Sequence, residues 1–249
     1  NMIALGGITL QNISLARAAA FDGVAAIGSI WKLDSTGAID VSRTRLAYQR
    51  LTRRWQAAGG TLQFISDGTL ATVEAYLKGG GRWVQLRMKE TPAETIITRG
   101  KTLLPLCHQY GALLIVNDDP QLAAAIGADG VHLGQSDMAP DDARKLLGER
   151  AIIGCTANTF EQIQKIAQSS ADYIGLGPFR YTTTKKNLAP LLGVEGYTRI
   201  MQQMAEAGIR LPLVAIGGIT VEDVPQIMAC GVNGLAISGS ISHAADVTF

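Results

Sequence analysis

Short apolar runs alternate with amphipathic segments along most of the chain. From residue 60 onward, eight runs have the length of buried strands, and the segments between them have helical periodicity. The predicted strands span 62–65, 83–86, 113–117, 130–133, 152–155, 173–175, 213–216 and 234–237. The predicted helices span 69–77, 93–108, 121–126, 141–147, 160–168, 194–207 and 221–229. Eight strands in alternation with helices predict an α/β protein, a (β/α)₈ TIM barrel rather than an open sheet.

Two internal repeats refine this prediction. Residues 128–134 recur at 171–177 and, more loosely, at 232–238, as expected for alternate strands of a barrel. Residues 2–30 also align without a gap onto 213–241, with 11 of 29 positions identical. We therefore expect two parts. Residues 1–59 would be a remnant of a second, related barrel plus a linker, and residues 60–249 would form a whole barrel with this extra N-terminal segment.

The remnant contains two strand-like segments, 2–5 and 24–27, and an amphipathic helix at 41–55. Exposed strand edges invite association, so we expect the two segments to pair with each other on the barrel surface or to be buried against another copy of the chain. We expect the apolar stripe of the helix to pack on the barrel. The remnant lacks acidic and basic residues like those of the barrel's strand ends, so we expect no second active site in it.

Composition narrows the function. At 47% hydrophobic and 17% charged residues, the chain can bury a large core, and a net charge of +1 leaves no broad basic field for nucleic acid or anionic membranes. No apolar run reaches the roughly 18 residues that span a bilayer. The three cysteines have no metal-binding spacing, which indicates reduced thiols, a cytoplasmic protein and no zinc site.

The predicted strand ends are unusually polar. In a TIM barrel the carboxyl ends of the strands carry the active site. Two carboxylates facing several cations indicate Mg²⁺ with a polyphosphate, and glycine-rich turns after the last two strands indicate a second phosphate. The candidate residues, in chain order, are Gln85, Arg87, Lys89, Asn117, Asp118, Asp137, Thr156, Thr182, Thr184, Lys185, Gly218, Ser238 and Gly239.

Several of these residues fall in motifs that together resemble the thiamine phosphate synthase family over residues 60–242. The motifs are Gln85-Leu86-Arg87-Met88-Lys89, Val116-Asn117-Asp118, Gly130-Val131-His132-Leu133-Gly134-Gln135-Ser136-Asp137-Met138, Gly175-Leu176-Gly177-Pro178 with Thr182-x-Thr184-Lys185-Lys186, and Gly217-Gly218-Ile219. Their order is the family's order. The combination is far more specific than any single motif.

The resemblance implies a transferase that joins hydroxymethylpyrimidine diphosphate to thiazole phosphate and releases pyrophosphate. It implies Mg²⁺ held by Asp118 and Asp137. Pyrophosphate would be contacted by Arg87, Lys89, Asn117 and Lys185, and the pyrimidine by Gln85 and Thr156. Thiazole phosphate would be contacted by Gly218, Ser238 and Gly239, and Thr182 and Thr184 would contact either this phosphate or the leaving group. We expect Lys185, Arg87 and Thr156 to be the catalytic residues. The expected partners are small-molecule substrates, and the sequence leaves a homo-oligomer possible.

Alternatives remain open at this point. Taken alone, Asp118 and Asp137 could be helix caps, and His132 could be a packed barrel histidine rather than a pocket residue. The chain could resemble the related thiazole tautomerase, act as a catalytically silent precursor-binding barrel, or be a generic sugar-phosphate isomerase. The sequence also departs from the family pattern at Thr156, where serine is usual, at Asn158, where histidine is common, and at Arg180-Tyr181, where Tyr-Pro is common. We expect the chemistry to be retained, because threonine keeps the hydroxyl, whereas the change at Arg180-Tyr181 leaves the geometry of the sixth loop open.

Overall fold

The computed structural model describes residues 2–9, 12–13, 16, 21, 23–26, 29–48, 62–180 and 191–242. Within residues 62–242, eight parallel strands form a closed barrel in which each strand pairs with the next and the last pairs with the first. The strands are β3 (Leu62–Ser66), β4 (Trp83–Leu86), β5 (Leu113–Asn117), β6 (Gly130–Leu133), β7 (Ile152–Ala157), β8 (Tyr173–Leu176), β9 (Leu213–Ile216) and β10 (Gly234–Ile237). The predicted TIM barrel is confirmed.

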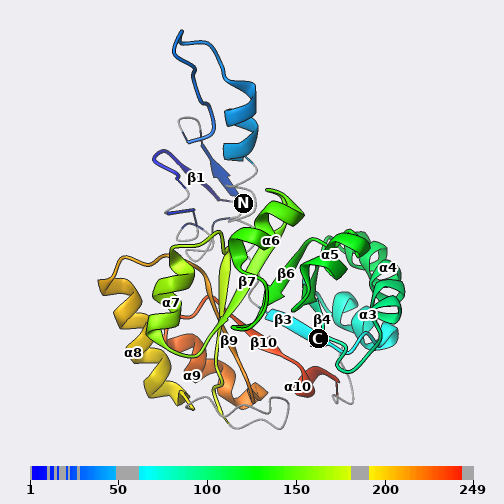
Figure 1. The fold of residues 1–249 in the computed structure, drawn as a ribbon. Coiled ribbons are helices and arrows are strands. Elements are labelled where there is room, and N and C mark those ends of the chain that lie inside the picture. The colour runs from blue at the N-terminus through cyan, green and yellow to red at the C-terminus, as the bar shows by residue number, and fades with distance from the viewer. Residues whose placement is uncertain are drawn as a thin grey trace.

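Helices surround the barrel (Figure 1). They are α3 (Leu70–Lys78), α4 (Ala93–Gln109), α5 (Pro120–Ile126), α6 (Pro140–Leu147), α7 (Phe160–Ala167), α8 (Gly193–Glu206), a short 3₁₀ turn η1 (Val221–Asp223) followed by α9 (Val224–Ala229), and α10 (Gly239–Ser242). Most boundaries fall within two residues of those predicted, because the apolar periodicity that predicts each element also buries it.

The core has two layers, as expected when helices cover a sheet that is closed on itself. The inner layer fills the barrel and includes Trp83, Ile115, Tyr173 and Val214. The outer layer lies between strands and helices and is mostly aliphatic. Both faces of the strands are therefore buried, which explains why they are continuous apolar runs rather than alternating ones.

A buried ion pair ties the start of β8 to α6. The Arg144 guanidinium lies 2.6 Å from the Asp172 carboxylate, and their side chains are 7% and 1% exposed. Asp172 also accepts the Ile153 backbone N–H at 2.9 Å, while Arg144 donates to the Gly148 carbonyl at 3.0 Å. The pair thereby satisfies backbone groups at the end of the barrel opposite the polar strand ends.

The N-terminal segment contains two parallel strands, β1 (Ile3–Leu5) and β2 (Gly23–Ala25), which pair with each other as predicted. Their register, with Ile3 opposite Gly23, reproduces that of β9 and β10, where the aligned Val214 lies opposite Gly234. Residues 41–48 are helical, and the rest of the predicted 41–55 helix lies outside the described residues.

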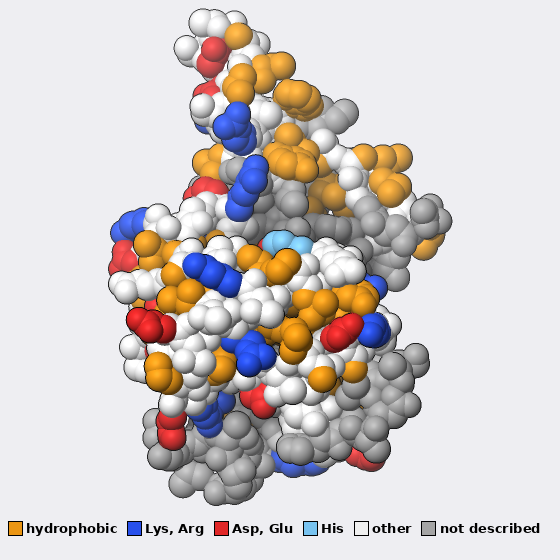
Figure 2. All heavy atoms as spheres, turned by 90° about the vertical axis from the view of Figure 1, so that its right-hand side faces the viewer, with side chains coloured by type: hydrophobic (Ala, Val, Ile, Leu, Met, Phe, Trp, Pro, Cys, Tyr) orange, Lys and Arg blue, Asp and Glu red, His pale blue; other side chains and the backbone are white. Residues whose placement is uncertain are grey.

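Of the apolar stripe that was expected to pack on the barrel, the structure describes Leu46, which is partly buried, and Tyr48, which is exposed; Leu51 and Trp55 lie outside the described residues. Val41 is 65% exposed and Tyr48 is 57% exposed. Figure 2 shows apolar side chains spread over the N-terminal segment at the top of the view. Amphipathic spacing predicted the helix, and the packing of its apolar stripe on the barrel stays a prediction. Within the described ranges, no helix has the length and apolarity needed to cross a bilayer.

Candidate active site

The carboxyl ends of the eight strands meet at one rim of the barrel, because all strands are parallel. The rim brings together residues that are far apart in sequence. It carries Gln85 on β4, Arg87 and Lys89 after β4, Asn117 on β5 with Asp118 after it, Asp137 after β6, Thr156 on β7, Gly218 after β9, and Ser238 and Gly239 after β10. Thr182, Thr184 and Lys185 lie outside the described residues, so their predicted roles stay predictions.

Asp118 has a backbone conformation that separates it from the helix that follows. Its φ is 68°, in the left-handed region that few non-glycine residues adopt, and its N–H donates to the His132 carbonyl at 2.7 Å. The helix cap is instead Asp119, whose side chain accepts the N–H groups of Gln121 and Leu122. The capping alternative is therefore wrong for Asp118, which lies at the rim after β5, and the cap is Asp119, which sequence reasoning did not consider.

Asp137 shapes the turn after β6. One of its carboxylate oxygens accepts the Gly134 N–H at 2.6 Å, and a β-carbon at Gly134 would lie 3.0 Å from that oxygen. This contact fixes the direction of the carboxylate. Because a carboxylate has two oxygens with several acceptor positions, Asp137 can still accept a further ligand.

Arg87 supplies positive charge at the same rim. Burial lowers the pKa of its guanidinium, and attraction to Asp118 opposes that decrease. Its backbone N–H donates to the Ser66 carbonyl at 2.8 Å, which holds the segment after β4 against the end of β3. An arginine stays charged even with a lowered pKa, so Arg87 and Asp118 place opposite charges close together in a partly desolvated setting.

Gln85 and Thr156 are buried inside the barrel and are joined by hydrogen bonds through Gln63, Tyr173 and His132, of which sequence reasoning considered only His132. The Gln85 side-chain amide donates to the Gln63 side-chain oxygen Oε1 at 3.1 Å, and the Gln63 side-chain amide donates to the Tyr173 hydroxyl at 3.2 Å. His132 lies between the Tyr173 hydroxyl, 2.9 Å from Nδ1, and the Thr156 hydroxyl, 3.0 Å from Nε2. The signal that could have found Gln63 and Tyr173 is a polar group inside an otherwise apolar strand.

The turn after β9 approaches the sixth loop closely. Gly217 and Gly218 have φ values of 99° and 67°, and a β-carbon on Gly217 would lie 2.8 Å from the Pro178 Cα. Backbone donors here can approach a phosphate only if side chains are absent. After β10, the Ser238 carbonyl accepts the N–H groups of Ile241 and Ser242, which starts α10 at the same rim.

Comparison with known proteins identifies the family. The sequence pattern of the thiamine monophosphate synthase family matches residues 61–241. This chain belongs to that family. A thiamine-phosphate synthase of Bacteroides thetaiotaomicron is 53% identical over 191 residues, which cover 75% of this chain and 91% of that protein. One from Flavobacterium psychrophilum is 44% identical over 187 residues, covering 73% and 91%.

A solved structure agrees with the sequence matches. The thiamine phosphate pyrophosphorylase of Pyrococcus furiosus is 31% identical and superposes with a TM-score of 0.69 over 78% of this chain and 92% of that one. The family pattern begins at residue 61, so the N-terminal segment lies outside it.

Two residues that depart from the family pattern, Arg180 and Asn158, make contacts at the start of the sixth loop. The Arg180 guanidinium lies 2.6 Å from the Asp223 carboxylate and covers the Phe179 ring, 5.2 Å from its centroid. Burial raises the pKa of Asp223, but hydrogen bonds from Thr220 and Arg180 outweigh it, so that the pKa falls below its usual value. Asn158 donates its side-chain amide to the Gly177 carbonyl. The start of the sixth loop is thus held by contacts from both sides.

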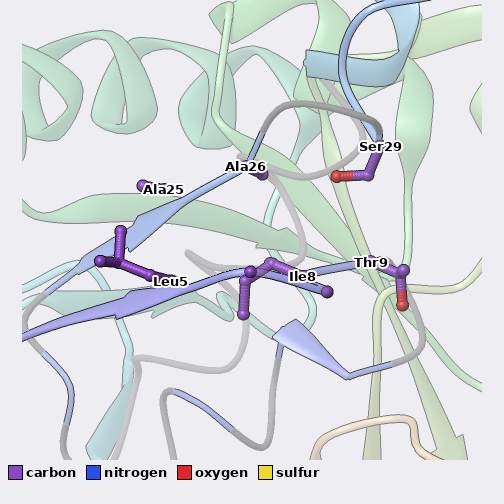
Figure 3. A pocket seen from close by; sticks show the side chains of 8 residues that line it. Leu5, Ile8, Thr9, Ala25, Ala26 and Ser29 are labelled. Carbon is purple, nitrogen blue, oxygen red and sulfur yellow. The ribbon is translucent and has the colours of Figure 1, made fainter.

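A cavity of about 520 Å³ lies outside the barrel, at the ends of β1 and β2 (Figure 3). Its lining within the described part of the segment is mostly apolar, with no ionisable side chain: Leu5, Gly6, Gly7, Ile8, Thr9, Ala25, Ala26 and Ser29. Gly6 and Gly7 align with Gly217 and Gly218 and share their positive φ. The cavity repeats the glycine turn of the barrel, and the expectation that the N-terminal segment forms no second active site stays a prediction.

Proposed function

We propose that this chain joins hydroxymethylpyrimidine diphosphate to thiazole phosphate, forming thiamine phosphate and releasing pyrophosphate. Family membership supports an enzyme of thiamine biosynthesis. The observation that carries the proposal is the juxtaposition of Asp118 and Arg87 at neighbouring strand ends, with Asp137 after the next strand. A thiazole tautomerase or an isomerase of sugar phosphates has no use for this set of opposite charges.

The reaction needs stabilisation of the leaving group. The bond between the pyrimidine methylene carbon and the diphosphate oxygen breaks, and its electron pair leaves with pyrophosphate. Arg87, Lys89, Asn117 and Lys185 would contact this group, and their positive charges and amide dipole would act most strongly as its negative charge develops. The pyrimidine amino group delocalises the cationic charge on the methylene carbon.

The nucleophile requires no protein base. The lone pair of the thiazole nitrogen forms the new bond to the methylene carbon, and no proton is removed in that step. Gly218, Ser238 and Gly239 would hold the thiazole phosphate, and Gln85 and Thr156 the pyrimidine. Thr182 and Thr184 would contact either this phosphate or pyrophosphate. The protein's contribution is therefore to align two substrates and keep them together.

The rim fits Mg²⁺ by the chemistry of its donors. This ion takes one or two protein carboxylates and completes its shell with water and phosphate oxygens, and Asp118 and Asp137 are two such carboxylates. Within the described ranges, no group of three or more His, Cys, Asp or Glu side chains is placed to hold a metal ion by itself. Bound Mg²⁺ would neutralise charge on the departing pyrophosphate.

The test is a coupled measurement of pyrophosphate release and thiamine phosphate formation by the purified chain. Product should require both substrates and Mg²⁺, and a chelator should abolish it. Isomerisation of a thiazole carboxylate phosphate without metal would instead indicate the tautomerase. Substrate binding without turnover would indicate the catalytically silent barrel.

We further propose that residues 1–59 are a copy of the last two βα units of a barrel followed by a linker. The matching strand registers support this, as does the exposure of Ile3 at 51%, since the aligned Val214 faces the barrel interior and is 1% exposed. Deleting residues 1–38 should preserve catalysis while changing solubility or a homo-oligomeric state. A folded deletion variant without activity would contradict this assignment.

The three cysteines support a proposal for the cellular compartment in which the protein works. Cys107, Cys155 and Cys230 are unbridged, and the first two are buried. A reducing cytoplasm suits such thiols and the soluble phosphorylated substrates.

A further inference from the structure

A buried chain of polar side chains crosses the barrel interior beneath the rim. Its five members come from five strands and are each less than 8% exposed: Gln63, Gln85, His132, Thr156 and Tyr173. The hydrogen bonds run from Gln85 to Gln63, from Gln63 to Tyr173, and through His132 to Thr156. Its two ends are the two residues proposed to contact the pyrimidine.

The direction of these bonds follows from the donors available. An amide NH₂ only donates, so the Tyr173 oxygen accepts from Gln63, and it also hydrogen-bonds Gln85. Burial raises the pKa of Tyr173, with bonds from Gln63 and Gln85 opposing part of the rise, so the hydroxyl keeps its proton. That proton is donated to His132 Nδ1, 2.9 Å away.

The state of His132 is thereby set. In a neutral imidazole one nitrogen accepts and the other donates. With Nδ1 accepting from Tyr173, Nε2 carries the hydrogen and donates to the Thr156 oxygen at 3.0 Å. The Thr156 hydroxyl then has its own proton to donate in another direction. At the other end, the Gln85 amide NH₂ is engaged by Gln63, so the group it can present to a ligand is its carbonyl oxygen.

Neighbouring glycines make room for the two central rings. A β-carbon on Gly154 would lie 2.1 Å from the Tyr173 ring, and one on Gly175 would lie 2.8 Å from His132 Cε1. The Tyr173 ring also packs edge-on against Trp83, with centroids 4.8 Å apart. These contacts restrict both rings, and a buried network with a fixed direction is expensive to reverse.

We propose that Tyr173 and His132 are positioning residues that make the site present one donor, the Thr156 hydroxyl, and one acceptor, the Gln85 carbonyl. This pattern is complementary to an aminopyrimidine, whose amino group donates and whose adjacent ring nitrogen accepts. It opposes the deaminated oxopyrimidine, whose carbonyl accepts and whose ring nitrogen carries hydrogen. The inference rests on the proposed function and assigns selection of the amino form to residues that do not themselves touch the ligand.

The first test measures the tautomer directly. Nitrogen NMR of the full chain, which has three histidines, should show His132 with a bare Nδ1 and a protonated Nε2 at neutral pH. Tyr173→Phe removes the donor to Nδ1, so the signals should shift toward a mixture of tautomers. A protonated Nδ1 in the unsubstituted protein would overturn the proposal, even if the variant failed to fold.

The second test measures selectivity by binding, since the amino group also affects reactivity. The probes are two non-reactive diphosphonate analogues of the pyrimidine diphosphate, one amino and one oxo. The unsubstituted protein should prefer the amino probe, and Tyr173→Phe should reduce the ratio of the two dissociation constants by about tenfold, as one mismatched buried polar contact implies. His132→Gln should retain most of the ratio, because its amide can accept from Tyr173 and donate to Thr156.

Tyr76→Phe is the matched control. It removes another buried tyrosine hydroxyl, which donates to the Leu62 carbonyl at 2.7 Å outside the network, so its selectivity should equal that of the unsubstituted protein. Equal ratios for Tyr173→Phe and Tyr76→Phe would refute the positioning role. If the unsubstituted protein bound neither probe and formed no product, the proposed function itself would have failed.

Discussion

The two neighbouring carboxylates Asp118 and Asp119 offer a sharp test of the rim, because Asp118 is a proposed metal ligand and Asp119 caps the following helix, α5. Asp118→Asn removes the charge but keeps a side chain that tolerates a positive φ. We expect turnover to fall about 100- to 1,000-fold, the range seen when one preorganised electrostatic group is lost, with the fold almost unchanged.

Asp118→Ala should lose the same activity and some stability as well. Its φ of 68° is unfavourable for alanine, and the left-handed conformation costs roughly 1 kcal/mol more than it does for asparagine. In a chain of this size, that difference lowers Tm by about 2–4 °C. Asp119→Ala should have the opposite effects, with stability reduced and turnover preserved. Loss of the cap costs about 1 kcal/mol of stability, while turnover stays close to that of the unsubstituted protein.

The assays are steady-state product formation over a range of Mg²⁺ concentrations and thermal unfolding of all four proteins. A change in the Mg²⁺ requirement of Asp118→Asn, absent from Asp119→Ala, would place the carboxylate at the metal. The reasoning fails if Asp118→Asn turns over normally with an unaltered Mg²⁺ requirement. It also fails if the two alanine variants lose activity equally.

Three further outcomes are expected. Asp172→Ala removes the carboxylate that neutralises the buried Arg144 and should lower the free energy of unfolding by about 3–5 kcal/mol, seen as a lower urea midpoint; a loss below 1 kcal/mol would contradict the stabilising role of the pair. Lys185→Ala should slow the single-turnover rate more than it weakens thiazole phosphate binding, since its charge is needed most as pyrophosphate departs; the opposite ranking would remove Lys185 from the leaving group. Burial raises the pKa of Cys155 to about 12, so its thiol stays protonated near neutral pH and should react with alkylating reagents more slowly than the partly exposed Cys230, as peptide mass spectrometry can measure.

Local sequence pattern was enough to predict the barrel and most of its rim. An apolar run of four residues between glycines and an amphipathic segment has few ways to be buried, and eight such repeats close into one architecture. Once the strands are placed, parallel order alone puts residues such as Gln85, Asn117 and Thr156 at one end. This part of the site followed from counting positions along each strand.

Other features depended on contacts between distant segments. Gln63 and Tyr173 are 110 residues apart, and no local pattern predicts that one donates to the other. The backbone N–H of Asp118 donates to the His132 carbonyl on the next strand, and its φ is positive. Asp119, rather than Asp118, caps α5. Periodicity reports which face of a segment is apolar, but only closure of the barrel decides which polar groups meet inside it and which direction their hydrogen bonds take.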